Sequence, residues 1–411
     1  GMRISTSQFQ RTSLSSILER QTKLAKLQQQ LGSGRRILTP SDDPAGAAQA
    51  LQLANKISQL ERLQANANLA NNRLTQEEST LEQVGTLIHR VHELAVAANN
   101  DHQSAADRKL IATELRERFE ELLQLANATD GNGEYLFAGV ASRDAPFLVS
   151  GDRQVTYVGD QTERFLQIGP ARQLAVNHTG FDVFMRIPQG NGHFVTTADP
   201  ANTGTGVIDN GQVLDPAALT GDSYEISFTR PDPDADELDY TVLDSDGNIV
   251  AQGVYESGAA IEFDGIAFTI TGEPVPGDGV VPGDIFTVTP AGPRSLFATL
   301  DDLISALETM GDTPVARARL HNVVNSSLAN LDHARENILR VRAEVGSRLH
   351  AIEAETAGNE DSTFTLQSVL SQIQDLDYAE AISEFNLKLV GYQAAQQSYM
   401  RVQGLSLFNL L

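Results

Sequence analysis

Residues 382–403 read ISEFNLKLVGYQAAQQSYMRVQ, and large side chains recur there in alternating steps of three and four positions. This spacing is close to 3.5 residues, the repeat of helices that wind around a partner helix. A helix of this kind carries one apolar seam, which must be buried against another surface. The seam runs through Ile382, Phe385, Leu389, Tyr392, Gln396, Tyr399 and Gln403. We therefore expect a long coiled-coil helix at the end of the chain.

The opening of the chain has the same pattern, through Leu14, Ile17, Gln21, Leu24, Gln28 and Leu31. Gly32-Ser33-Gly34 then predicts a helix end, and the segment from Thr39 to Pro44 supplies cap residues and a proline suited to a first helical position. A second helix is expected over 45–100 and a third over 104–127. Because the two flanks have matching seams, we expect them to pack on each other.

The last flank is also helical. Residues 295–355 read as one long helix, and an interruption between Gly311 and Pro314 stays open. We expect a break from Gly358 to Ser362, and a final helix that starts near Phe364 and continues close to the end of the chain.

The middle of the chain differs sharply from both flanks. Residues 140–294 contain 12 of the 15 prolines and 19 of the 32 glycines, and their 23 acidic and 7 basic residues give a net charge of −16. Alternating segments at 154–158, 224–228, 240–250, 261–271 and 284–289 predict short strands, with an Asp-Gly turn in the third. We expect a small antiparallel sheet.

The expected fold class is therefore α+β. A long helical coiled-coil bundle built from both flanks carries an inserted antiparallel β domain. We divide the chain into a terminal assembly domain (1–44 and 360–411), a helical rod domain (45–139 and 295–359) and an acidic, β-rich outer domain (140–294).

The terminal seams are expected to be weak, because glutamine occupies positions where leucine or isoleucine binds best. Such helices bury one face and must still offset roughly 1–2 kcal/mol of backbone entropy per residue. We predict that about 40 residues at the start and about 50 at the end are poorly ordered in the isolated monomer, until partner subunits cover the remaining apolar face. Residues 1–41 have a net charge of +6 and residues 353–411 one of −6, so opposite charges favour docking of the two ends.

Composition excludes several functions. The chain of 411 residues has no cysteine, which rules out disulfides and cysteine nucleophiles, and its net charge of −24 argues against nucleic-acid binding. The sequence has no run of 18 apolar residues, which is the length that would predict a membrane-spanning helix. His89 and His92 are spaced for one helix face but lack a third metal ligand at a suitable spacing. We expect no catalytic residue, cofactor or metal, and therefore no enzyme.

Several segments resemble the flagellin superfamily, and more closely its hook–filament junction members than its filament subunits. They are the opening Met2-Arg3-Ile4-Ser5-Thr6, Gly34-Arg35-Arg36-Ile37 followed by Pro40-Ser41-Asp42-Asp43-Pro44, residues 107–139, residues 330–348, and the close Leu405-Ser406-Leu407-Phe408-Asn409-Leu410-Leu411. These motifs occur in order and cover both flanks, about 250 residues.

The resemblance implies a structural subunit that lies outside the cell in the bacterial flagellum. It implies export through the flagellar type III apparatus without a cleaved signal, and assembly as a ring of like subunits between a layer of hook-associated protein 1 and the first layer of flagellin. It also implies that an export chaperone holds the C-terminal helix beforehand. The expected assembly and partner-binding residues are Leu14, Ile17, Leu24, Leu31, Ile382, Phe385, Leu389, Tyr392, Tyr399, Leu405, Phe408 and Leu411.

Two other interpretations stay open at this point. A short flagellin, which builds the filament, could have drifted toward the same motifs. The acidic insert could also be an adhesin-like module on a helical stalk, although it offers few aromatic residues for glycan binding.

Overall fold

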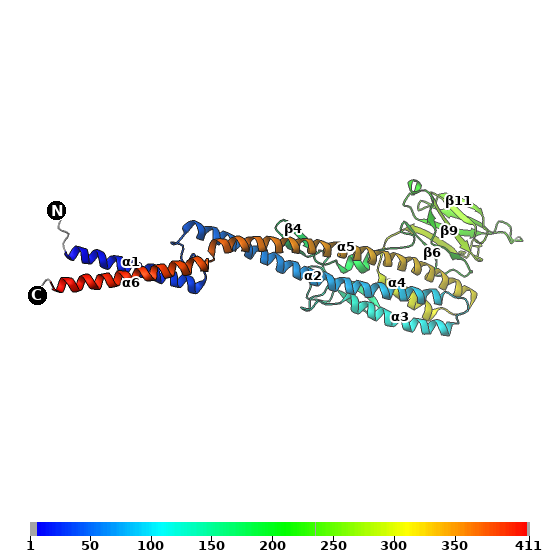
Figure 1. The fold of residues 1–411 in the computed structure, drawn as a ribbon. Coiled ribbons are helices and arrows are strands. Elements are labelled where there is room, and N and C mark those ends of the chain that lie inside the picture. Colours follow the sequence, from blue (N-terminus) through cyan, green and yellow to red (C-terminus); the bar gives the residue numbers. More distant parts are fainter. Residues whose placement is uncertain (1–5, 235, 409–411) are drawn as a thin grey trace. The chain divides into compact units, whose positions relative to one another are not determined.

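The computed structural model describes residues 6–234 and 236–408, which form two compact units (Figure 1). The first unit contains the described residues of 1–66, 168–172 and 354–411, and the second contains those of 67–167 and 173–353. The described α-helices are α1 (Thr6–Ser33), α2 (Pro44–Ala98), α3 (Ala105–Ala126), α4 (Leu296–Thr309), α5 (Pro314–Gln374) and α6 (Tyr378–Phe408). The predicted α+β class, with helices from both flanks and an inserted antiparallel sheet domain, is confirmed.

Local signals in the sequence set most helix boundaries. Gly34, with φ of +69°, follows the last residue of α1, as glycine often does at a helix end. Pro44 is the first residue of α2, and the carboxylate of Asp43 accepts a hydrogen bond from the amide of Gly46 at 2.9 Å. Ser104 and Asp107 form a capping box at the start of α3.

The interruption between Gly311 and Pro314 is real, since α4 ends at Thr309 and α5 begins at Pro314. The predicted break at Gly358 to Ser362 is wrong, because α5 runs through it to Gln374. A single glycine costs a helix only about 1 kcal/mol, and the buried Asn359 there donates a hydrogen bond to the carbonyl of Ile168 at 3.0 Å.

The true break lies at 375–377. The carboxylate of Asp377 accepts hydrogen bonds from the amides of Ala379 and Glu380 at 3.0 and 3.1 Å, and thereby caps α6. An acidic residue followed three positions later by glutamate is a recognisable helix start, so the sequence did contain the signal.

The inserted domain lies within the second unit and contains two antiparallel sheets. The larger has the strand order β11 (Ile249–Val254), β10 (Asp239–Leu243), β9 (Tyr224–Thr229), β14 (Ile285–Pro290) and β6 (Phe194–Ala198). In the smaller, β13 (Ile266–Thr271) pairs with β12 (Ala260–Phe263), β7 (Val207–Ile208) and β8 (Gln212–Val213). Their core includes Ile226, Phe228, Val242, Phe268 and Phe286.

Among the described residues, three shorter strand pairs lie outside these two sheets. They are β1 (Phe147–Ser150) with β2 (Gln154–Tyr157), β3 (Phe165–Gly169) with β4 (Arg172–Ala175), and β5 (Ile187–Pro188) with β15 (Pro293–Arg294). A π-helical turn, η1 (Phe181–Met185), and a 3₁₀ turn, η2 (Pro216–Ala218), lie between strands. The predicted strands at 154–158, 224–228, 240–250, 261–271 and 284–289 are all present, the third and fourth as hairpins, and their bounds agree within two residues except that β11 continues to Val254. Other strands, among them β6 of the larger sheet, were not predicted.

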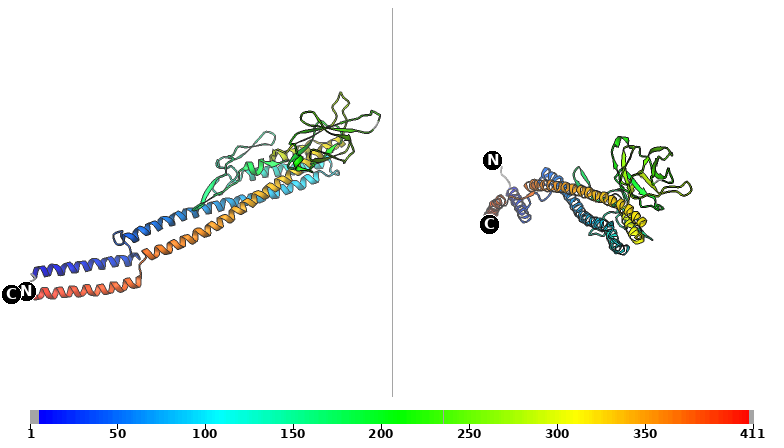
Figure 2. Two further views of the ribbon diagram at one scale, coloured as in Figure 1. Left: turned by 90° about the horizontal axis from the view of Figure 1, so that it is seen from above. Right: turned by 90° about the vertical axis from the view of Figure 1, so that its right-hand side faces the viewer.

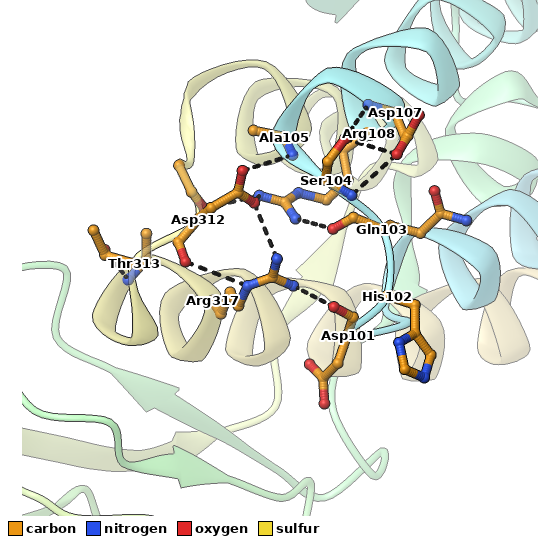
Figure 3. Close-up of polar contacts among 12 residues, drawn as sticks. Asp101, His102, Gln103, Ser104, Ala105, Asp107, Arg108, Asp312, Thr313 and Arg317 are labelled. Atoms are coloured by element: carbon orange, nitrogen blue, oxygen red, sulfur yellow. Dashed lines mark hydrogen bonds and ion pairs between the residues drawn. The ribbon is translucent and has the colours of Figure 1, made fainter.

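In the second unit, a buried arginine donates hydrogen bonds to the loop before α3 and to the loop between α4 and α5 (Figure 3). The guanidinium of Arg108 on α3 donates to the carbonyls of Gln103 and Gly311 at 2.8 Å and to that of Met310 at 3.2 Å. The carboxylate of Asp312 lies 3.2 Å from the same guanidinium. Arg108 therefore joins the loop before α3 to the loop between α4 and α5.

Candidate assembly surface of the terminal helices

In the first unit, backbone hydrogen bonds join the loop that follows α1 to the segment between α5 and α6. The amide of Arg36 donates to the carbonyl of Gln374 at 2.8 Å, and the amide of Leu376 donates to the carbonyl of Gly34 at 2.9 Å. The loop after α1 and the break between α5 and α6 thus share backbone hydrogen bonds. We call these two segments, 34–43 and 375–377, the hinge.

Charged side chains stabilise the first hinge segment. Asp42 accepts from the amides of Leu38 and Thr39 at 3.0 Å and forms an ion pair with Lys26 at 2.7 Å. The hydrogen bond from Lys26, followed by those from the backbone, lowers the pKa of the Asp42 carboxyl to about 2. The amide of Gly46 and then the guanidinium of Arg36 lower the pKa of Asp43 in the same way.

Beyond the hinge, α1 and α6 pair in antiparallel orientation, and both views in Figure 2 agree on this. Near the hinge, a Cβ on Gly34 would lie 2.8 Å from the hydroxyl of Tyr378. Farther along, a Cβ on Gly391 would lie 3.1 Å from the guanidinium of Arg20. The expectation that the two flanks of the chain pack on each other is therefore met within this unit.

The predicted assembly residues fall into three groups. Those that are half-buried between α1 and α6 are Ile17, Leu24, Leu31, Phe385, Leu389, Tyr392 and Tyr399. Leu14 and Ile382 are instead exposed, at 47% and 49%. Leu405 and Phe408 belong to α6, but their side chains lie outside the described part of the chain, as does the whole of Leu411.

The glutamines do not lie in the seam between α1 and α6, contrary to the prediction. Gln21, Gln28 and Gln396 are exposed, whereas Leu27 and Ala381, which the predicted seam omitted, are 6% and 4% exposed. Leu27 thus replaces Gln28, and Ala381 replaces Ile382, whereas Ile17, Leu24 and Phe385 keep their predicted positions in the stripe. Both helices carry two adjacent apolar stripes, and the spacing alone does not tell which of them meets the partner helix.

Large apolar side chains stay exposed at several positions on these helices. On α6, Leu387, Val390 and Met400 are 76%, 65% and 62% exposed. On α1, Leu18 and Phe9 are 53% and 49% exposed. Exposed apolar patches of this kind mark surfaces that bind another protein.

The charges of the two ends do not meet as ion pairs. Lys23 pairs with Glu19 on its own helix at 2.6 Å, and Lys26 and Arg36 pair with the carboxylates of the hinge. Among the described residues, no ion pair joins α1 to α6. The expected attraction between the ends is therefore not realised as direct contacts within one molecule.

Sequence reasoning missed the residues that build the hinge. Asp42 and Asp43 were expected only as part of a helix cap and of the resemblance, Arg36 only as part of the resemblance, and Leu376 and Tyr378 were placed inside a helix. An arginine after a Gly-x-Gly helix end was a usable signal, because a cation often caps a nearby helix C-terminus.

Within residues 6–234 and 236–408, no group of three or more His, Asp or Glu side chains is arranged to hold a metal ion. His89 lies 3.4 Å from Glu93, and His92 lies 3.8 Å from Asp332. Among the described helices, none is long and apolar enough to span a membrane.

Comparison with known proteins gives matches over both flanks and over the full length. Residues 4–142 match the bacterial flagellin N-terminal helical region, and residues 328–411 match the bacterial flagellin C-terminal helical region. The flagellar hook-associated protein 3 of Escherichia coli (strain K12) is 26% identical over 410 residues, which cover 100% of this chain and 99% of that protein.

Solved structures agree with this match. FlgL of Xanthomonas campestris is 34% identical with a TM-score of 0.71, over 78% of this chain and 99% of that one. The flagellar junction protein FlgL of Legionella pneumophila is 31% identical with a TM-score of 0.69, over 79% and 99%. A Salmonella flagellin, in contrast, matches only 28% of this chain.

Proposed function

The chain belongs to the hook-associated protein 3 (FlgL) family of the flagellin superfamily, and on this premise we propose that it assembles through its terminal helices as a structural subunit of the flagellum at the hook–filament junction. The full-length match to hook-associated protein 3 favours this function over that of flagellin, since a Salmonella flagellin matches only 113 residues of this chain. The observation that carries the assembly mechanism is the set of exposed apolar side chains on α1 and α6.

The proposed partners follow from the position of the junction. Like subunits form a ring, hook-associated protein 1 lies on the hook side, and flagellin lies on the filament side. The predicted residues, among them the exposed Leu14 and Ile382, would serve these contacts together with the exposed Leu387 and Val390. An amphipathic helix bound in a groove is a common mode of such recognition.

We further propose that the same helix is covered before assembly. An export chaperone would hold residues 382–411 and release them for passage through the type III apparatus. The absence of cysteine supports this proposal, because no disulfide can trap a chain that must be threaded unfolded. The role is structural, and no enzymatic activity is proposed.

We propose that three parts of the chain have different roles. Residues 1–44 and 360–411 assemble, residues 45–139 and 295–359 act as a rod, and residues 140–294 form an acidic insert that faces water. The net charge of −16 in the insert supports an exposed position, since a charged surface stays soluble.

Deletion of residues 382–411 tests the proposal in a strain that lacks its own hook-associated protein 3 and expresses this chain. Secretion into the medium and attachment of filaments to hooks are both measured. We expect filament attachment to be lost, and secretion to fall if the chaperone binds there. Wild-type motility from this deletion would contradict the proposed function.

A matched control removes apolar surface elsewhere. Val280 and Val281 lie in the acidic insert and are 89% and 62% exposed. The double variant V280S/V281S should secrete the chain and attach filaments normally. If the deletion abolishes filament attachment and the control variant does not, the assembly function lies in the terminal helix.

A further inference from the structure

One face of α1 is used by no other described part of the chain. Arg11, Leu14 and Leu18 follow one another at steps of three and four residues, which puts them on one side of the helix. All three are exposed, with Leu14 at 47% and Leu18 at 53%. Arg11 forms no ion pair among the described residues. This face, which we call the α1 outer face, lies beside the stripe of Ile17, Leu24 and Leu27 that is buried against α6.

The same unit carries a groove of suitable chemistry on the other side of the hinge. It has a volume of about 600 Å³ and lies between the segments of α2 and α5 that belong to this unit. Leu60, Leu63 and Leu366 give it an apolar lining. Its polar lining residues are Lys56, Gln59, Asp361, Ser362 and Thr365. Asp361 is exposed and forms no ion pair among the described residues.

Charge is separated along this unit in a way that suits the two surfaces. On the groove side of the hinge, residues 44–66 and 354–374 contain four acidic and two basic side chains. On the other side, residues 6–33 and 378–408 contain six basic and three acidic side chains. The two sides therefore carry opposite net charges, which favours contact between different molecules.

The outer face of α1 does not reach the groove of its own chain. Leu14 lies 20 residues before Gly34, which corresponds to about 30 Å of helix. Between these points α1 is packed along α6, and the groove lies past the hinge on α2 and α5. A second molecule has no such restriction.

We propose that the outer face of α1 in one copy of this chain docks into the groove between α2 and α5 of a second copy. The inference rests on the proposed function and names the contact by which like subunits join. Leu14 and Leu18 would cover the leucines of the groove, and Arg11 would pair with Asp361. Because two different surfaces meet, the contact can repeat from subunit to subunit and close a ring.

Site-directed cross-linking tests this contact, since the chain has no native cysteine. Purified full-length L14C is mixed with full-length S362C, and a short bismaleimide links neighbouring thiols. We expect a dimer between the two variants whose yield rises with concentration. The matched control replaces L14C by L110C, because Leu110 is 71% exposed on α3 in the second unit. The control should give about tenfold less dimer.

Charge exchange supplies the second arm. Adding R11E to L14C should lower the dimer yield about tenfold, and adding D361R to S362C should restore it. Circular dichroism on each variant verifies that it folds. Restoration by the reversed pair would identify Arg11 and Asp361 as partners across the contact.

Three results would overturn the proposal. They are a dimer yield equal to that of L110C, a yield that ignores both charge changes, and an efficient link inside one dilute chain that carries both L14C and S362C. The last result would mean that the groove is filled by α1 of the same chain. If cross-linking fails while deletion of 382–411 still abolishes filament attachment, this contact falls and the proposed function stands.

Discussion

The guanidinium of Arg36 donates two hydrogen bonds to the carbonyl of Ile373, from Nη2 at 2.8 Å and from Nε at 3.2 Å. Ile373 lies in the last turn of α5, where carbonyl groups have no partner within the helix. A cation at this end also interacts favourably with the helix dipole. Arg36 therefore links the loop that follows α1 to the C-terminal end of α5, next to the break that precedes α6.

Replacing Arg36 by alanine should loosen the hinge. The carbonyl of Ile373 loses its donor, and Asp43 loses its ion pair with Arg36 at 3.2 Å. We expect hydrogen exchange at the amide of Leu376 to become roughly tenfold faster. Exchange measured by mass spectrometry over 370–380 reports this change. Arg62→Ala is the control, since Arg62 is exposed and has no ion pair among the described residues, and it should leave exchange unchanged.

Replacing Arg108 by alanine should destabilise the second unit much more. Arg108 is 0% exposed, so its replacement leaves an unfilled space and removes the donor to the carbonyls of Gln103, Met310 and Gly311. We expect a loss of roughly 3 kcal/mol in the free energy of unfolding. Urea unfolding followed by circular dichroism measures it. Lys109→Ala, at the exposed neighbouring position, should change the free energy by less than about 0.5 kcal/mol.

A buried histidine should make the second unit sensitive to alkaline pH. His178 lies between Glu77, at 2.6 Å from Nδ1, and Glu344, at 3.0 Å from Nε2. Burial lowers the pKa of His178, but the hydrogen bond and charge of Glu77 outweigh it, so the net pKa is raised above 6.5. Burial raises the pKa of Glu77 above 4.5. Arg348, whose charge also acts on His178, lies on α5 with Glu344.

The sign of this effect follows from linkage. A group whose pKa is higher in the folded state stabilises the protein below its unfolded pKa, and that stability is lost as pH rises through the folded value. For His178 we expect the free energy of unfolding to fall as pH rises from 6.5 into the alkaline range. His178→Gln should flatten this slope, and His350→Gln, at a position 85% exposed, should keep it. A slope that survives His178→Gln would assign it to other groups.

The sequence predicted the elements that depend on local signals. Caps and prolines placed the starts of α2 and α3 within one or two residues. The alternation of apolar side chains predicted most strands of the two sheets of the insert but missed β6, β7 and β8. The break at 375–377 was missed because Gly358 looked like a stronger helix breaker than Asp377. Tertiary packing of Asn359 offsets the cost of that glycine, and packing is not visible in the spacing of residues.

The assembly surface could be predicted in outline only. The heptad pattern identified α1 and α6 as paired helices, but it assigned Gln21 and Gln28 to a contact that Leu27 makes. A helix with two adjacent apolar stripes can turn either of them toward its partner, and the free energy of the whole assembly decides between them. The hinge was missed because its bonds join residues more than 300 positions apart.

Polar substitutions on the uncovered face of α6 should separate assembly from folding. Leu387 and Val390 are exposed in the single molecule, so L387S/V390S should change the melting temperature by no more than about 2 °C. Filament attachment should nevertheless fail, because the face that partners cover has become polar. Normal attachment by this variant would mean that partners use another face. L110S/V140S, at positions 71% and 52% exposed in the second unit, is the matched control.

Limited proteolysis of dilute monomer tests whether the terminal helices need partners. Each of α1 and α6 buries only one stripe, mostly to the half-buried level, while the second unit encloses cores of fully buried phenylalanines such as Phe119, Phe228 and Phe286. Local opening costs least where few apolar contacts are lost. We expect cleavage first within about 40 residues of the start and about 50 of the end, and slower cleavage at high concentration. Ends that resist digestion as well as residues 140–294 do would show that one molecule stabilises them alone.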